Sequence, residues 1–155
     1  MATNTTTLFN AYEAFRQIVE TALDSLNSGW HVSDGEPRAG EYNNIAALLG
    51  ATNWDMAPAG IGAGSPSFPL DEKYSIQVRL AVWDGGQIQS SPRNEIKNAY
   101  EAILLGVRNN PTLDVPGILW SHIGITEFEQ GLTDQNGSAA QIDIFLEVTA
   151  RITYE

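Results

Sequence analysis

The 155-residue sequence contains no cysteine, which excludes disulfide bonds, thiolate metal sites and cysteine nucleophiles. Basic residues are scarce: eight Lys and Arg stand against nineteen Asp and Glu, for a formal net charge of −11. Because contacts to phosphate need clustered Lys and Arg, this balance argues against a nucleic-acid-binding protein. The simplest role of the acidic excess is solubility, and it also gives a surface that repels polyanions.

Long hydrophobic runs are also missing. No apolar stretch approaches the roughly 20 residues that a membrane-spanning helix needs. Residues Met1–Thr7 hold no basic segment followed by an apolar one, as a secretory signal would. We therefore expect that the protein is made in the cytoplasm and does not associate with a membrane. The length and the 43% hydrophobic fraction are typical of one globular domain, here residues 1–155.

Two segments repeat their apolar residues at the spacing of a helix with one buried stripe. The first runs from about Leu8 to Asn27 and ends at Ser28-Gly29, since glycine readily adopts the conformation that ends a helix. The second spans roughly Pro92 to Asn109, with Ser91 as its N-cap. The polar stretch from Trp30 to Asn44 is predicted as a linker.

Alternation of apolar and polar residues is typical of a strand with one buried face. It predicts strands at Tyr74–Trp83, Ile118 to about Glu129, and Ala140–Tyr154, while the short apolar run Ile45–Leu49 predicts a fourth. Gly50–Leu70 is rich in Gly and Pro and is predicted as a long irregular loop. Short turns favour antiparallel pairing, and both helices need an apolar surface to cover. The predicted fold is α+β: a two-layer sandwich with two helices on one face of an antiparallel sheet of about four strands.

No residue pattern predicts a reaction. The glycine-rich run Gly60–Ser65 lacks the spacing of a nucleotide-binding loop, and Asp134–Gly137 lacks the glutamate that completes a calcium loop. The two histidines, His31 and His122, are far apart, and no nucleophile motif accompanies either. We expect no catalytic, cofactor-binding or metal site, and hence no enzyme. A carboxylate pair, as in some hydrolases, stays open because spacing selects none.

The predicted sheet face opposite the helices is unusually aromatic. With Ile123 and Ile125 turned toward the helices, the alternating residues on the other face form a candidate subunit interface, because aromatic residues and Arg are enriched at such interfaces. Its predicted members are Arg79, Trp83, Trp120, His122, Phe128, Phe145, Glu147 and Arg151. The alternative is that another segment of the chain, such as Gly50–Leu70, folds over this face.

The order of these elements resembles the tail terminator (tail completion) proteins of long-tailed bacteriophages. The resemblance lies in a leading amphipathic helix, a polar linker, a strand at Tyr74–Trp83 that ends at Asp84-Gly85, a helix at Asn94–Val107 and two closing strands. It extends from about Leu8 to Thr153 and includes no diagnostic motif.

Membership of this family implies a structural virion protein, assembled in the host cytoplasm. Such proteins form a ring, typically a hexamer, that caps the tail tube and joins it to the head. The implied partners are copies of the chain itself, the tail tube protein and the head–tail connector or neck proteins. The acidic charge fits a channel through which DNA passes without specific binding. Alternatives are another connector or neck protein, or a small cytosolic hydrolase with a carboxylate site.

Overall fold

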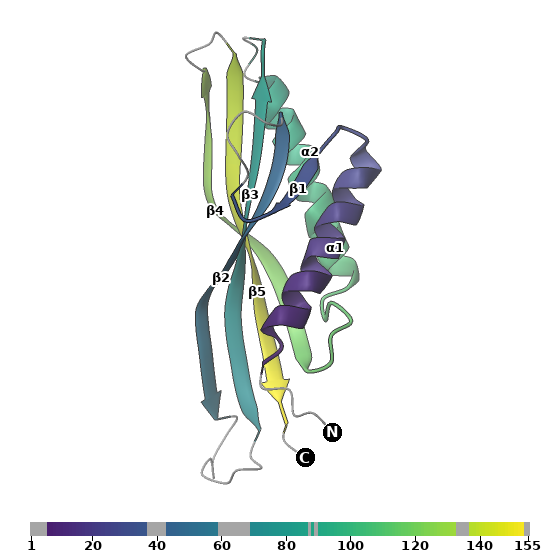
Figure 1. Ribbon diagram of the computed structural model, residues 1–155, viewed down its shortest axis with the longest axis vertical. Helices are drawn as coiled ribbons and strands as arrows, with labels where there is room; N and C mark the ends of the chain where they lie inside the picture. Colours follow the sequence, from purple (N-terminus) through teal and green to yellow (C-terminus); the bar gives the residue numbers. More distant parts are fainter. Residues whose placement is uncertain are drawn as a thin grey trace.

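The computed structural model describes residues 6–36, 43–58, 69–86, 88, 90–132 and 137–153. Within these residues both helices lie on one side of a long, strongly twisted sheet (Figure 1). The elements are α1 (Leu8–Leu26), β1 (His31–Asp34), β2 (Asn44–Pro58), β3 (Leu70–Asp84), α2 (Ser90–Asn109), β4 (Ile118–Leu132) and β5 (Ser138–Ile152). The predicted α+β class, with both helices on one face of the sheet, is confirmed.

The sheet has one strand more than predicted, and it is mixed. Its order is β1-β2-β3-β5-β4. The pairs β2–β3, β3–β5 and β4–β5 are antiparallel, whereas β1 pairs with β2 in parallel. The extra strand, β1, lies in the stretch that was predicted as a polar linker. Its four residues are too few to show an alternating pattern.

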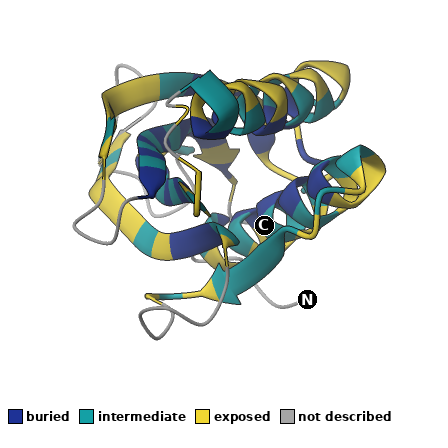
Figure 2. Cartoon of the chain, turned by 90° about the horizontal axis from the view of Figure 1, so that it is seen from above, coloured by how far each residue is buried: buried dark blue, intermediate teal, exposed yellow. Residues whose placement is uncertain are grey.

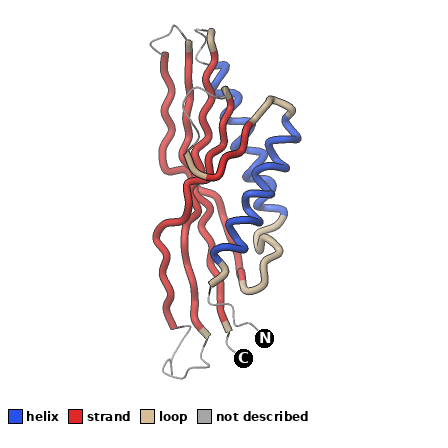
Figure 3. The backbone as a smooth tube through the Cα atoms, viewed as in Figure 1, coloured by secondary structure: helices blue, strands red, loops and turns tan. Residues whose placement is uncertain are grey.

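The prediction of an irregular loop at Gly50–Leu70 is wrong for the first half of that segment. Strand β2 continues to Pro58 and pairs with β3 along its whole length. Two irregularities in this pairing, between Leu48 and Gly50 and between Thr52 and Asp55, break the alternation that would have identified the strand. The rest of that predicted loop, residues 59–68, lies outside the described residues. Figure 3 shows the strands extending past the helices at both ends of the molecule.

The core lies between the helices and the sheet, where the buried positions of the two layers face each other (Figure 2). Strand β5 is an interior strand, with β3 on one side and β4 on the other, and its alternating apolar residues on the helix side are almost fully buried. Each helix buries one stripe of apolar residues, as the sequence predicts. The buried residues are Ala11, Phe15, Val19 and Leu23 in α1, and Ile96, Ala99, Ile103 and Val107 in α2. Helix α2 begins at Ser90, so Ser91 is inside the helix and is not its N-cap.

A buried carboxylate fixes the start of α1. Glu72 of β3 is 0% exposed, and its carboxylate is the acceptor in the following four hydrogen bonds. The Thr7 backbone N–H and the Thr7 hydroxyl both donate to Oε1, each at 2.8 Å. The Thr6 hydroxyl and the Trp54 indole N–H donate to Oε2, the latter at 2.7 Å. The negative charge therefore lies at the positive end of the α1 dipole, where it stabilises the helix. We call this group of Thr6, Thr7, Trp54 and Glu72 the Glu72 clamp.

The Glu72 clamp predicts a loss of stability in acid. Burial alone would raise the pKa of Glu72, but the hydrogen bonds from Thr6, Thr7 and Trp54 outweigh burial and lower the pKa from its usual 4.5. A carboxyl with a lowered pKa in the folded state stabilises the fold above the unfolded-state pKa, and that contribution is lost as the pH falls through the folded-state pKa. We therefore expect the free energy of unfolding, measured with urea, to decline as the pH falls below about 4.5.

The control is Glu72→Gln, which keeps the side-chain volume but cannot accept all four hydrogen bonds. At neutral pH it should lower the free energy of unfolding by roughly 1–3 kcal/mol. In acid its stability should decline less than that of the wild type. Parallel acid profiles for the two proteins would show that other groups cause the decline.

Candidate subunit interface

Strand register places an aromatic group on the sheet face opposite the helices, which we call the outer face. Along neighbouring rows of β4 and β5, Trp120 lies beside Thr149, His122 beside Glu147, and Gly124 beside Phe145. The Trp120 side chain is 42% exposed, which is unusual for tryptophan in a folded chain. Four of the predicted interface residues, Trp120, His122, Phe145 and Glu147, are thus neighbours.

The rings of this group contact one another. Trp120 and His122 are stacked, with centroids 5.0 Å apart and planes 15° apart. His122 meets Phe145 edge-on at 6.4 Å and 74°. Its Nε2 lies 3.9 Å from a carboxylate oxygen of Glu147. Stacked and edge-on rings are favourable geometries, so the group forms one preorganised surface. We call these four residues the outer-face cluster.

Gly124 leaves the space that the Phe145 ring occupies. A Cβ atom at Gly124 would lie 2.3 Å from the ring, closer than any real contact, so only glycine leaves room for it. A glycine inside a strand often marks such a close approach, and this signal in the sequence was missed. The ring covers the bare backbone of β4 and is itself held half-buried.

Two ion pairs flank the outer-face cluster along β5, one at Asp143 in the interior of the β3–β5 ladder and one at Arg151 near its end. Arg79 pairs with Asp143 at 2.9 Å and also reaches Glu36 at 3.0 Å. Arg151 pairs with Asp71 at 2.8 Å, and this hydrogen bond lowers the pKa of Asp71 from its usual 3.8. Both arginines were predicted as interface residues. The structure brings them to the borders of the cluster, where their charges are already matched within the chain.

Trp83 and Phe128 lie apart from the outer-face cluster. Trp83 is on the outer face beside Ala139, near one end of the β3–β5 ladder, whereas Phe145 is at its middle beside Gln77. Phe128 is beside Ile142, whose side chain faces the helices, so its predicted place on the outer face is wrong. The reason is an irregularity in β4 between Ile125 and Glu127, which shifts the alternation by one residue. Phe128 is nevertheless 44% exposed, because neither helix covers this end of β4.

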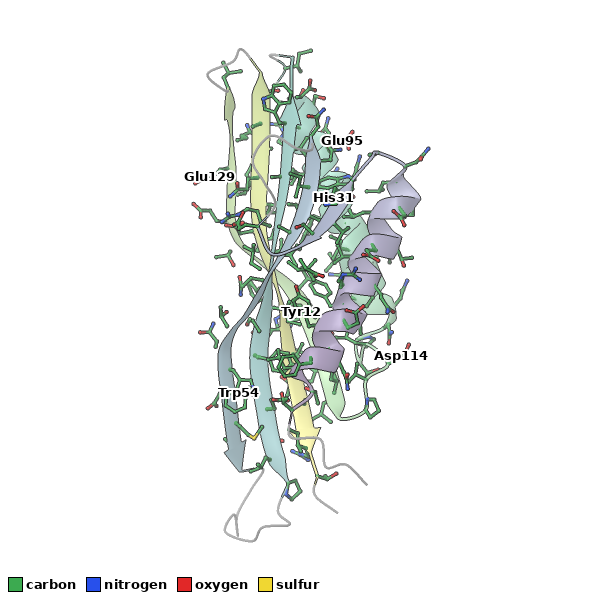
Figure 4. The ribbon with its side chains drawn as sticks, viewed as in Figure 1. Tyr12, His31, Trp54, Glu95, Asp114 and Glu129 are labelled. Atoms are coloured by element: carbon green, nitrogen blue, oxygen red, sulfur yellow. The ribbon has the colours of Figure 1, made fainter. Side chains whose placement is uncertain are left out.

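The acidic residues of the outer face include one close carboxylate pair, Glu127 and Glu129 of β4. Both side chains are exposed, and Glu129 is labelled in Figure 4. A hydrogen bond that protonated Glu127 donates to the Glu129 carboxylate, together with the charge of Glu129, raises the pKa of Glu127. Among the residues that the structure describes, no three His, Asp or Glu side chains are grouped as metal ligands. In the same residues no helix is long and apolar enough to cross a membrane.

The described part of Gly50–Leu70 does not cover the outer-face cluster. Residues 50–58 belong to β2, and both β3 and β5 separate β2 from β4 in the sheet. For this segment the alternative of self-cover is therefore wrong. Residues 59–68 are outside the described residues, so the alternative is untested for them.

No protein-family model matches this chain, and no curated protein matches it. Among solved structures, the chain is similar to one described as "Virion of native gene transfer agent (GTA) particle". The identity is 12%, the TM-score is 0.48, and the match covers 90% of this chain and 93% of that one. The description is of a virion, the broad class that the sequence resemblance implies, and it does not specify a tail terminator. At this TM-score the similarity carries no argument about what this chain does.

Proposed function

We propose that this chain is a structural virion protein that associates with copies of itself through the outer face of its sheet. The observation that carries this proposal is the outer-face cluster: the His122 ring contacts both Trp120 and Phe145 on a face that neither helix covers. Aromatic residues that are packed in advance and left accessible to solvent are typical anchors of protein–protein interfaces. A purely solvated face would not need them.

The more specific proposal is a ring that acts as a tail terminator. A ring forms when two different patches of one subunit meet head to tail. The outer-face cluster supplies one patch, and the part of the β2–β3 hairpin beyond the helices offers the other (Figure 3). The sequence resemblance supports a hexamer, with the tail tube protein and the connector or neck proteins as partners. It also supports a position at the tail–head junction of a phage virion.

The charge of the chain supports an acidic channel in this ring. At −11 per subunit, carboxylates around the lumen would repel DNA phosphates and let DNA pass without binding. Imaging of the ring tests this directly, because a lumen lined by Arg79, Arg93 or Arg108 would contradict it.

The test is the mass of the purified full chain by light scattering, combined with negative-stain imaging. Rings or stacked rings are expected, and sedimentation with isolated tail tubes should show the ring bound at the tube end. A ring that binds connector proteins but no tail tubes would instead indicate another neck protein. A strict monomer that remains monomeric in the presence of tail tubes would contradict the proposed assembly.

A further inference from the structure

The inference concerns the paired ends of β2 and β3 next to the start of α1, residues 50–58 and 70–74, which we call the arm. In the arm, Thr52 lies beside Ser75 and Asp55 beside Lys73, so two residues of β2 stand opposite one residue of β3. This is a β-bulge, and one of its residues, Asn53, has a φ of 56° in the left-handed region. Bulges redirect side chains, and here the redirected side chain is Trp54.

The bulge brings Trp54 to the Glu72 clamp. Its indole N–H donates to the buried carboxylate at 2.7 Å, although about half of the side chain is exposed. No side chain of residues 51–57 is fully buried. Apart from its pairing with β3, this segment therefore has little packing of its own. The Trp54–Glu72 hydrogen bond ties it to the rest of the molecule.

The same carboxylate holds the first turn of α1. The Thr7 hydroxyl donates to Glu72 and lies 2.8 Å from the Tyr74 hydroxyl, which therefore donates to it in turn. The Thr6 hydroxyl also accepts a hydrogen bond from the Leu8 backbone N–H, at 3.1 Å. Three segments distant in sequence thus meet at one buried charge: the start of α1, the bulge of β2 and β3 itself.

Sharing a single acceptor couples these segments. All the donors in the Glu72 clamp are neutral groups, so together they replace the water that a carboxylate would otherwise bind. Loss of the donors from one segment leaves a buried charge with too few partners. The carboxylate then turns toward water, and the remaining donors lose their acceptor as well. Opening of the clamp is therefore cooperative.

We propose that the Glu72 clamp is a latch that locks the arm to the first turn of α1 and releases the two together. By thermodynamic linkage, a partner that binds the arm with Trp54 turned outward also loosens the start of α1. A partner that pulls the start of α1 away from Glu72 likewise releases Trp54. The latch is a property of the single chain, so it stands or falls independently of ring assembly.

Hydrogen exchange of the intact chain, read by mass spectrometry at neutral pH, tests the latch from both sides. Trp54→Phe removes only the donor on the arm, yet the amides of residues 7–10 should exchange faster. The expected acceleration is at least about tenfold, which corresponds to the loss of one hydrogen bond to a charged group. Thr7→Val removes the hydroxyl that donates to Glu72 and accepts from Tyr74 and changes nothing in residues 51–57, yet amides of residues 51–57 should accelerate similarly. Amides of β5 and α2 should not change in either variant.

The matched control is Asp71→Asn, which alters the neighbouring carboxyl of β3 on the opposite face and breaks the ion pair with Arg151. It should leave the exchange of residues 7–10 and 51–57 unchanged. Acceleration confined to the mutated segment in both Trp54→Phe and Thr7→Val would overturn the latch. So would equal acceleration throughout the chain, because that indicates only a general loss of stability.

Discussion

Replacing Trp120 or Phe145 with aspartate is expected to abolish self-association and to leave a folded subunit. Both side chains lie in the outer-face cluster, away from the core between the sheet and the helices. Truncation of an aromatic anchor at an interface typically costs about 2 kcal/mol or more, roughly 30-fold in affinity. The added charge raises this cost, because a neighbouring subunit would bury it without a partner. Light scattering measures the loss of assembly, and circular dichroism with thermal unfolding measures the fold.

Phe9→Asp is the matched control for these two variants. Phe9 is an aromatic residue of α1 that is 75% exposed, and α1 lies on the opposite side of the sheet from the outer face. This change should affect neither assembly nor folding. Unfolding of both Trp120→Asp and Phe145→Asp would place the two residues in the core, and folded variants that still assemble would exclude the outer face as the interface.

The second large effect is expected at Phe15, the largest side chain that α1 buries. It is 0% exposed and packs in the core cluster between α1 and the sheet. Phe15→Ala should lower the free energy of unfolding by about 3–5 kcal/mol, through lost burial and the cavity that remains. This is a large part of the roughly 5–15 kcal/mol that stabilises a typical domain.

Phe9→Ala makes the same chemical change on the same helix at an exposed position. Its effect should be within about 0.5 kcal/mol, as is usual for surface substitutions. Urea unfolding of both variants at neutral pH gives the comparison. Equal losses in the two variants would mean that helix propensity, and not burial of the ring, determines the effect.

Much of the fold could be predicted because its central elements carry regular patterns. The stripe of α1 and the alternation of β5 both follow from one face packing against a core while the other does not. For these elements the predicted and observed positions differ by a residue or two at the ends, as at Leu8–Leu26 and Ser138–Ile152. Trp120, His122 and Phe145 were placed together on the outer face by the same alternation.

The sequence was misleading where a strand is irregular. In β4, one extra residue between Ile125 and Glu127 moves Phe128 to the helix side, and no local signal marks the shift. In β2, the bulge at Asn53 and the exposure of both faces of the strand remove the alternation, so a paired strand was predicted as a loop. A bulge depends on the register with the partner strand, which a single segment does not encode.

The sequence by itself determined the fold class, the two helices and the central strands, because burial of one face imposes a period on local residues. It also determined the excess of acidic charge and the absence of thiol chemistry. Only the tertiary structure decided the partners of isolated polar residues: Glu72 with Thr7 and Trp54, and Arg79 with Asp143. These contacts join segments more than a dozen residues apart, so the spacing of residues along the chain does not predict them.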